Sequence, residues 1–370
     1  MTASSTLQQP MPTATQPGAS VPAIWGEPMD FWHAPAVIAE NNFIYKSLSN
    51  WAFNIAVGCS HACRFCYVPS AATIKQGAKL SEYGVSDPDA EWGDYVLLRK
   101  WDETRFLASL RAAENTPPSQ LKPDGNRAIM YCSTTDPYQV IHHPQAERQR
   151  ELATAARFLV RRSLELIRDH STLRVRILTR SPLAKADFPL FKTLGNRLLF
   201  GMSLPTLRND LARIYEPRAP APSQRLATLR AARDAGLHVY VAIAPTYPEC
   251  DEHDLRATFD AVADLDPVTV FHEPINIRAE NVERIKAHAK AVGVQLRTEV
   301  FSTRETWQAY AIDSLSAARR AAKEAGIEKQ LHLWPDRALG HSSVVSRQPN
   351  PAAYVQALHH AWAKISAWPR

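Results

Sequence analysis

The sequence lacks the features of a membrane or secreted protein. No apolar run approaches the ~20 residues that a membrane-spanning helix needs. Residues 1–25 are rich in Ser, Thr, Pro, Gln and Ala, and they contain no basic region followed by an apolar core. We therefore predict a disordered leader there rather than a signal peptide. These absences favour a cytoplasmic protein with no membrane-bound part.

Cysteine is scarce, and positive and negative charges are close to balance. The 370 residues include five cysteines, an odd number that argues against a disulfide framework in a chain without a secretory segment. The net charge of +6 is mildly basic, so it permits an anionic partner without identifying one. One helical stretch, residues 147–168, is rich in arginine, but it also contains glutamates, as a solvated helix face does. No internal repeat or nucleic-acid-binding motif is visible.

Three of the five cysteines stand together as Cys59, Cys63 and Cys66, with the spacing C-x3-C-x2-C. Three thiolates this close in sequence can bind one metal centre, but they leave one iron of a four-iron cluster open to a further ligand. A structural zinc ion normally takes four protein ligands, so a zinc site would need His61 or a distant residue as the fourth. A redox pair would use only the last two cysteines and leave Cys59 unexplained. The spacing therefore favours an iron–sulfur cluster, with zinc as an alternative.

Strand and helix patterns alternate regularly through the rest of the chain. The expected strands lie at 51–57, 127–132, 173–179, 197–202, 237–244 and 268–272, and the later ones are followed by helices at 145–169, 183–194, 223–235, 252–263 and 279–291. Near-continuous apolar strands separated by helices predict a parallel α/β sheet, in which functional groups gather at the C-terminal strand ends. Beyond this region we expect a strand over 294–300 and helices over 303–324 and 352–367.

The cysteine segment, with Phe65 and Tyr67 beside its last cysteine, closely resembles the radical S-adenosylmethionine (radical SAM) superfamily. Further segments resemble the spore photoproduct lyase-like branch of that superfamily in order and spacing. They lie at 133–139, 177–181, 201–203, 216–217 with 225–226, and 241–245. The resemblance covers about residues 53–245. It implies a partial (β/α)6 parallel barrel over 45–292, followed by a C-terminal α/β extension over 293–370.

The resemblance also implies the cofactors. In the superfamily three cysteines bind a [4Fe-4S] cluster, S-adenosylmethionine chelates the fourth iron, and reductive cleavage of its sulfonium gives a 5′-deoxyadenosyl radical. Carried over by position, Thr134 would border the amine of S-adenosylmethionine, Arg180 its carboxylate and Ser203 its ribose. The alternatives are a surface charge for Arg180 and a helix cap for Ser203. The residues expected near the adenine are Tyr67, Val241 and Ile243.

Cys132 ends the second expected parallel strand and should face the same end of the barrel as the cysteine loop. In the spore photoproduct lyase-like branch, a cysteine in a similar context returns a hydrogen atom to the product radical. This chain has one extra residue between Cys132 and Asp136, which could turn the thiol away from the site. A buried core cysteine is the equally weighted alternative. The polar residues of 272–278 end the sixth strand, where we expect either a closed hydrogen-bond network or a substrate contact.

These features together predict a radical SAM enzyme. The resemblance suggests a carbon–carbon lyase related to the repair of DNA photoproducts, with DNA as the substrate and flavodoxin or ferredoxin as the electron donor. Radical-based modification of a small molecule or natural product is one alternative. A non-catalytic iron–sulfur or zinc protein that uses the barrel for interaction is another.

Overall fold

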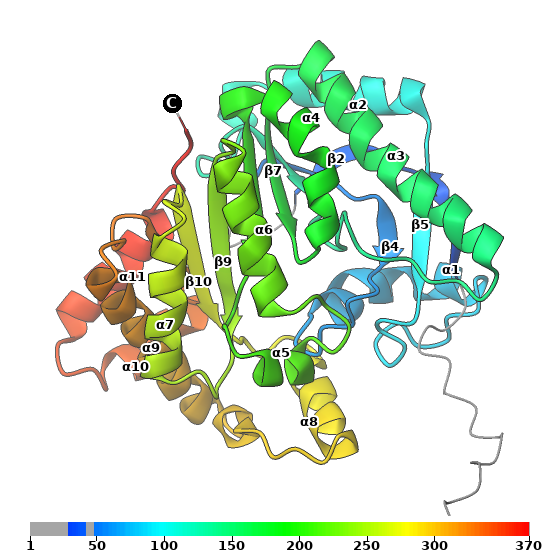
Figure 1. Cartoon of the computed structure of the whole chain (residues 1–370). Helices are drawn as coiled ribbons and strands as arrows, with labels where there is room; N and C mark the ends of the chain where they lie inside the picture. Colours follow the sequence, from blue (N-terminus) through cyan, green and yellow to red (C-terminus); the bar gives the residue numbers. More distant parts are fainter. Residues whose placement is uncertain (1–28, 42–47, 370) are drawn as a thin grey trace, which may run out of the picture.

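The main element of the fold is one eight-stranded, mostly parallel sheet (Figure 1). The computed structural model describes residues 29–41 and 48–369, so the predicted leader over 1–25 lies outside the described residues. The strands of this sheet are β2 Ile38–Glu40, β3 Trp51–Phe53, β6 Ala128–Tyr131, β7 Arg174–Thr179, β8 Leu198–Ser203, β9 Val239–Thr246, β10 Thr269–Pro274 and β11 Leu331–Leu333. They lie in the order β11-β10-β9-β8-β7-β6-β3-β2, and every neighbouring pair is parallel except β2 with β3. The predicted parallel α/β architecture is confirmed, as an open, partial barrel with β2 and β11 at its edges.

Helices α3 Ala146–His170, α4 Phe188–Thr193, α6 Pro222–Asp234 and α7 Glu252–Ala263 pack along the outer face of the sheet (Figure 1). Helices α5 Asn209–Tyr215 and α8 Asn281–Ala291 lie beyond the ends of the strands. The other helices are α1 Gly77–Ser81, α2 Glu103–Glu114, α9 Arg304–Glu324, α10 Ser342–Val345 and α11 Pro351–Ala363. The bounds of α3, α6, α7 and α9 lie within one residue of the predicted ranges. Among the described residues, no helix is both long and apolar enough to cross a membrane.

The two faces of the sheet have different roles. Along β7, Val175 and Ile177 are fully buried in the core beneath the helices. Leu178 and, just past the end of the strand, Arg180 line a cavity on the opposite face. Because successive residues of a strand point to opposite faces, each inner strand supplies both the core and the wall of this cavity.

The predicted strand over 51–57 is two strands in two sheets. After β3 the chain leaves the ladder at Asn54, whose side chain accepts a hydrogen bond from the backbone N–H of Thr134 at 3.0 Å. It then forms β4 Ala56–Gly58 in a second sheet, in the order β1-β5-β4, with β1 Met29–Pro35 and β5 Val96–Lys100. Gly58 has φ +90°, and a Cβ there would lie 2.2 Å from the carbonyl oxygen of Tyr95, so this sharp exit toward the cysteines requires glycine.

The C-terminal part differs from the prediction in one strand. No strand forms over 294–300; the chain is irregular there and ends in a 3-10 turn, Thr298–Phe301, because Val294 remains exposed while Val300 and Phe301 pack into the core. Instead, β11 pairs in parallel with β10. The extension predicted over 293–370 therefore shares its sheet and its core with the preceding segment.

Candidate functional site

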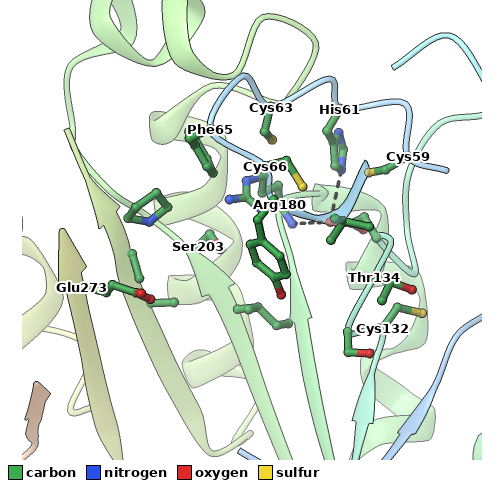
Figure 2. A pocket seen from close by; sticks show the side chains of 18 of the residues that line it. Cys59, His61, Cys63, Phe65, Cys66, Cys132, Thr134, Arg180, Ser203 and Glu273 are labelled. Atoms are coloured by element: carbon green, nitrogen blue, oxygen red, sulfur yellow. Dashed lines mark hydrogen bonds and ion pairs between the residues drawn. The ribbon is translucent and has the colours of Figure 1, made fainter. Parts of the chain in front are cut away.

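A cavity of about 500 Å³ lies at the C-terminal ends of the inner strands. Its wall combines the cysteine loop, the ends of β6 to β10 and the segment after β11 (Figure 2). Eight of the predicted site residues line it: Cys59, Cys63, Cys66, Tyr67, Cys132, Thr134, Arg180 and Ser203. The structure thus brings together residues that span 144 positions of the sequence.

The three clustered cysteines are free thiols on one side of this cavity. Burial raises the pKa of the Cys59 and Cys66 thiols and raises that of Cys63 to about 12. A bare thiolate is therefore disfavoured here, and a cationic metal centre would stabilise it. Within residues 29–41 and 48–369, no three Cys, His, Asp or Glu side chains are arranged to hold one metal ion. In a [4Fe-4S] cluster each thiolate binds a different iron, so the three thiols need not converge on one ion. The three cysteines therefore fit such a cluster.

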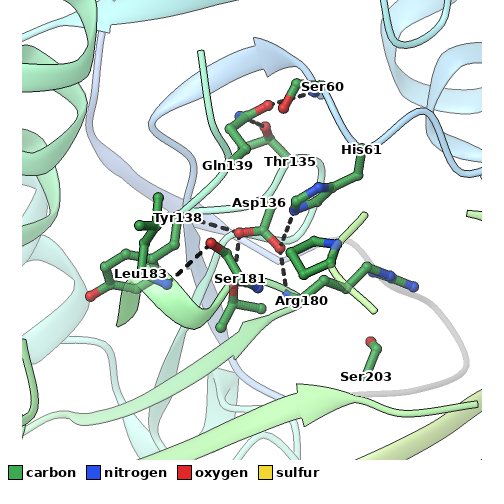
Figure 3. Close-up of polar contacts among 12 residues, drawn as sticks. Ser60, His61, Thr135, Asp136, Tyr138, Gln139, Arg180, Ser181, Leu183 and Ser203 are labelled. Carbon is green, nitrogen blue, oxygen red and sulfur yellow. Dashed lines mark hydrogen bonds and ion pairs between the residues drawn. The ribbon is translucent and has the colours of Figure 1, made fainter. Parts of the chain in front are cut away.

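Asp136 joins the cysteine loop to two strand ends (Figure 3). One carboxylate oxygen accepts hydrogen bonds from the hydroxyl of Thr179 at 2.7 Å and the N–H of Tyr138 at 2.8 Å. The other accepts the N–H of Arg180 at 2.8 Å and faces Nε2 of His61 at 3.1 Å. Burial alone would raise the pKa of Asp136, but His61 and the hydrogen bonds lower it. His61, the candidate fourth ligand of a zinc site, is thus directed at a carboxylate.

A second set of hydrogen bonds holds the cysteine loop from the segment after β6 (Figure 3). The hydroxyl of Thr135 donates to the carbonyl of Gly58 at 2.6 Å and accepts a hydrogen bond from Gln139 at 2.7 Å. The side-chain oxygen of Gln139 accepts the N–H of Ser60 at 2.7 Å. The motif at 133–139 therefore positions the loop as well as lining the cavity. The sequence pointed to this motif but not to these roles.

Arg180 is part of a buried ion-pair cluster rather than a surface charge. Its Nε donates to Glu216 at 2.5 Å, and the other oxygen of Glu216 pairs with Arg225 at 2.5 Å. Glu216 and Arg225 have fully buried side chains, and that of Arg180 is 17% exposed. Burial would raise the pKa of Glu216, but the charges of Arg225 and Arg180 outweigh it and lower the pKa to about 2. This carboxylate holds Arg180 at the cavity wall. The guanidinium of Arg180 lies 5.7 Å from the ring centre of Phe65.

Two predicted adenine contacts, Val241 and Ile243, do not reach the cavity. Both are fully buried in the core on the helix side of β9. The cavity is lined instead by their neighbours Tyr240, Ala242 and Ala244, because residues of a strand alternate between faces. The two predicted residues therefore lie on a strand that lines the cavity, but on its opposite face.

Cys132 lies at the cavity wall, one residue beyond β6 and beside Thr134 (Figure 2). It is 6% exposed and also contacts the hydrophobic core, so the extra residue before Asp136 does not remove it from the cavity. Burial raises the pKa of its thiol, which keeps the S–H proton in place at neutral pH.

The polar residues after β10 form part of a network that reaches the cysteine loop. Asn281 donates to the carbonyl of Phe65 at 3.2 Å, and Arg284 donates to the carbonyl of Cys66 and pairs with Asp89. Sequence reasoning missed both residues, because a helix more than 200 positions away carries no local sign of contact with the loop.

Comparison with known proteins adds to this geometry. The family model of the radical SAM superfamily matches residues 53–262. An uncharacterised protein of Acidianus two-tailed virus is 32% identical over 257 residues, which cover 67% of this chain and 75% of that protein. An uncharacterised protein of Mycobacterium tuberculosis is 26% identical over 194 residues, 52% of this chain and 48% of that protein, so this chain spans about half of that relative.

Among solved structures, spore photoproduct lyase complexed with dinucleoside spore photoproduct superposes with a TM-score of 0.57, over 85% of this chain and 87% of that one. The two are 14% identical, so the likeness concerns the fold.

Proposed function

Because the chain belongs to the radical SAM superfamily, whose members use a [4Fe-4S] cluster and S-adenosylmethionine, we propose that Cys59, Cys63 and Cys66 bind the cluster. The enzyme would cleave S-adenosylmethionine reductively to a 5′-deoxyadenosyl radical. The observation that carries this proposal is the convergence of three thiols on one cavity, whose wall also holds Arg180. Cys59 and Cys63 are buried there, and Cys66 is partly buried.

The chain's own residues would bind and orient S-adenosylmethionine. The guanidinium of Arg180 suits the carboxylate, since it forms charge-assisted hydrogen bonds in a partly dry site. Thr134 would border the amine, Ser203 the ribose and Tyr67 the adenine. The [4Fe-4S] cluster, when bound, would supply the electron, and the walls of the cavity would shield the reaction from water.

We further propose that the substrate reaction is a carbon–carbon cleavage of the kind used in DNA photoproduct repair. The fold likeness to spore photoproduct lyase supports it. The position of Cys132 supports it too, since a thiol at the cavity wall can give a hydrogen atom to a carbon radical.

One observation favours the alternative of a small-molecule or natural-product substrate. Much of the positive charge of the arginine-rich helix α3 is already paired with carboxylates. Arg162 pairs with Glu103 at 2.6 Å, and Arg168 pairs with Asp169 at 2.7 Å. The formal charge therefore overstates the attraction of this face for phosphates.

The test is anaerobic reconstitution followed by iron analysis and product analysis with dithionite and S-adenosylmethionine. We expect about four irons per chain and slow release of 5′-deoxyadenosine even without substrate. A fully loaded protein that releases none would contradict the proposal. An added flavodoxin or ferredoxin should replace dithionite as the electron donor.

The lyase proposal is tested with a dinucleoside photoproduct and Cys132→Ala. If Cys132 is the hydrogen donor, the variant should keep its cluster and its cofactor cleavage but divert the substrate radical into abnormal products. If Cys132 only packs in the core, the product distribution should stay the same. No turnover of the photoproduct by the unaltered enzyme would favour the small-molecule alternative.

A further inference from the structure

One wall of the cavity lies outside the segment that the superfamily model matches. The residues proposed to hold the cluster and S-adenosylmethionine lie between Cys59 and Ser203, inside the matched range 53–262. Eight further residues of the cavity wall lie beyond it, among them Phe271, Glu273, Asn276 and Trp334. Figure 2 shows Glu273 on the side of the cavity away from Thr134 and Cys132. These residues are not among those proposed to bind the cluster or S-adenosylmethionine.

Asn276, one of these residues, carries a hydrogen-bond acceptor with no partner among the described residues. The residue is 7% exposed, and this acceptor, its Oδ1, is buried. Its Nδ2 donates to Glu273, which fixes the orientation of the amide. Asn281 holds the same loop by donating to the carbonyl of Asn276 at 2.9 Å. A buried acceptor in a rigid frame requires a donor, and a ligand with an N–H group would provide one.

Two stacked aromatic rings line the same cavity. Phe271 and Trp334 have ring centres 4.6 Å apart at an interplanar angle of 24°. The backbone N–H of Trp334 donates to the backbone carbonyl of His272 at 2.9 Å, which holds Trp334 against β10. Trp334 is only partly buried and lines the cavity. Such a platform favours a flat ring stacked on it.

Charge and space narrow the class of ligand. Glu273 brings a carboxylate, while the neighbouring Arg278 is paired with Asp336. This part of the wall therefore suits a neutral or cationic group better than a phosphate. A volume of about 500 Å³ must also hold the cofactor, and ligand pockets typically measure ~300–1,000 Å³ in total.

We propose that Phe271, Glu273, Asn276 and Trp334 form a substrate subsite for one planar heterocycle that carries N–H donors. The ring stacks on Trp334 and donates to Oδ1 of Asn276, with the Glu273 carboxylate beside it. This inference rests on the proposed function for the presence of the cofactor in the same cavity. It adds the part of the substrate that the cavity recognises.

The experiment measures binding, so it does not depend on turnover. Equilibrium dialysis of the reconstituted full-length protein with S-adenosylmethionine compares radiolabelled uracil, which has two N–H donors, with 1,3-dimethyluracil, which has none. We expect uracil to bind at least tenfold more tightly. Equal affinities would overturn the proposal, and this comparison on the unaltered protein needs no variant to fold.

Three variants assign the contacts. Asn276→Leu should weaken uracil at least tenfold and leave dimethyluracil unchanged, and Trp334→Leu should weaken both. Ile277→Ala changes an exposed side chain of the same loop and is the matched control, with no change expected. A rise in the Kd of S-adenosylmethionine in place of these losses would show that this wall holds the adenine and would overturn the proposal. Absence of 5′-deoxyadenosine release would instead refute the proposed function, while the uracil result would stand.

Discussion

Replacing Glu216 with glutamine should destabilise the protein far more than a typical charge change. In the folded protein this carboxylate lies between two guanidiniums, those of Arg180 and Arg225, each at 2.5 Å. Glu216→Gln removes the only negative charge of this trio while leaving both cations in place. Arg225 is fully buried, so its charge would lose its partner without gaining water. The perturbation therefore exposes the cost of an uncompensated buried charge.

Two routes give the same magnitude. Removing one partner of a buried ion pair typically destabilises a protein by about 3–5 kcal/mol. Independently, the pKa of Glu216 falls from an ordinary 4.5 to about 2, because Arg225 and Arg180 outweigh the effect of burial. At about 1.4 kcal/mol for each pH unit, this fall corresponds to roughly 3 kcal/mol of stability. We expect Glu216→Gln to lower the free energy of unfolding by about that amount at pH 7.

The pH dependence has a definite sign. The folded pKa lies below the unfolded one, so the stabilisation is complete above about pH 4.5 and is lost as pH falls toward 2. The difference in the free energy of unfolding between the native protein and the Glu216→Gln variant should therefore be constant from about pH 6 to about pH 8 and shrink in acid.

Urea unfolding of the apoprotein, followed by tryptophan fluorescence, measures this difference. Glu299→Gln is the matched control, since Glu299 pairs with Arg297 at 3.7 Å and both side chains are at least 60% exposed. That pair should contribute about 1 kcal/mol or less. If the free energies of unfolding of the two variants differ by less than about 1 kcal/mol, Glu216 does not compensate the buried charge of Arg225 as inferred.

Three further predictions concern the cofactor site. Cys63→Ala should lose most of the iron. Cys250 does not line the cavity, so Cys250→Ala should keep its iron. Full iron content in Cys63→Ala would exclude Cys63 as a ligand. Arg180→Ala should raise the Kd of S-adenosylmethionine roughly tenfold to hundredfold in equilibrium dialysis, because a charge-assisted hydrogen bond contributes about 1.5–3 kcal/mol; an unchanged Kd would show that Arg180 only balances Glu216. Asp136→Asn should speed the removal of iron by a chelator, since Asp136 ties the cysteine loop to β7, and an unchanged rate would contradict that role.

The helices could be predicted from sequence because their signals are local. The predicted range of α7, 252–263, is also the observed one, and Asp251 caps the helix by accepting the N–H of Asp254 at 2.8 Å. The predicted strand over 294–300 had only an apolar pattern in its favour. A strand needs a partner, and the edge of β10 is taken by β11, so this segment packs its apolar residues without joining the sheet.

The face of β9 could not be read from the strand itself. Its residues are apolar at both parities, so alternation gives no contrast. The deciding contact is with another strand: a Cβ at Gly201 would lie 2.3 Å from the ring of Tyr240. Gly201 therefore makes room for Tyr240 on the inner face, which turns Val241 and Ile243 outward. Gly201 belongs to the sequence motif at 201–203, but only the pairing of β8 with β9 shows that it makes room for Tyr240.

The proposed cofactor site depends on local sequence, whereas the proposed substrate site depends on contacts between distant segments. The proposed cluster ligands lie within eight residues, so their spacing alone specifies a donor set. The opposite wall depends on contacts such as that of Asn281 with Phe65, which joins residues 216 positions apart. Trp334 reaches the cavity only because β11 pairs with β10 at the edge of the sheet. Local sequence can therefore predict the cofactors that the chain uses. The shape of the cavity wall opposite the cysteines arises from the tertiary fold, so its role in substrate binding must be tested on the folded protein.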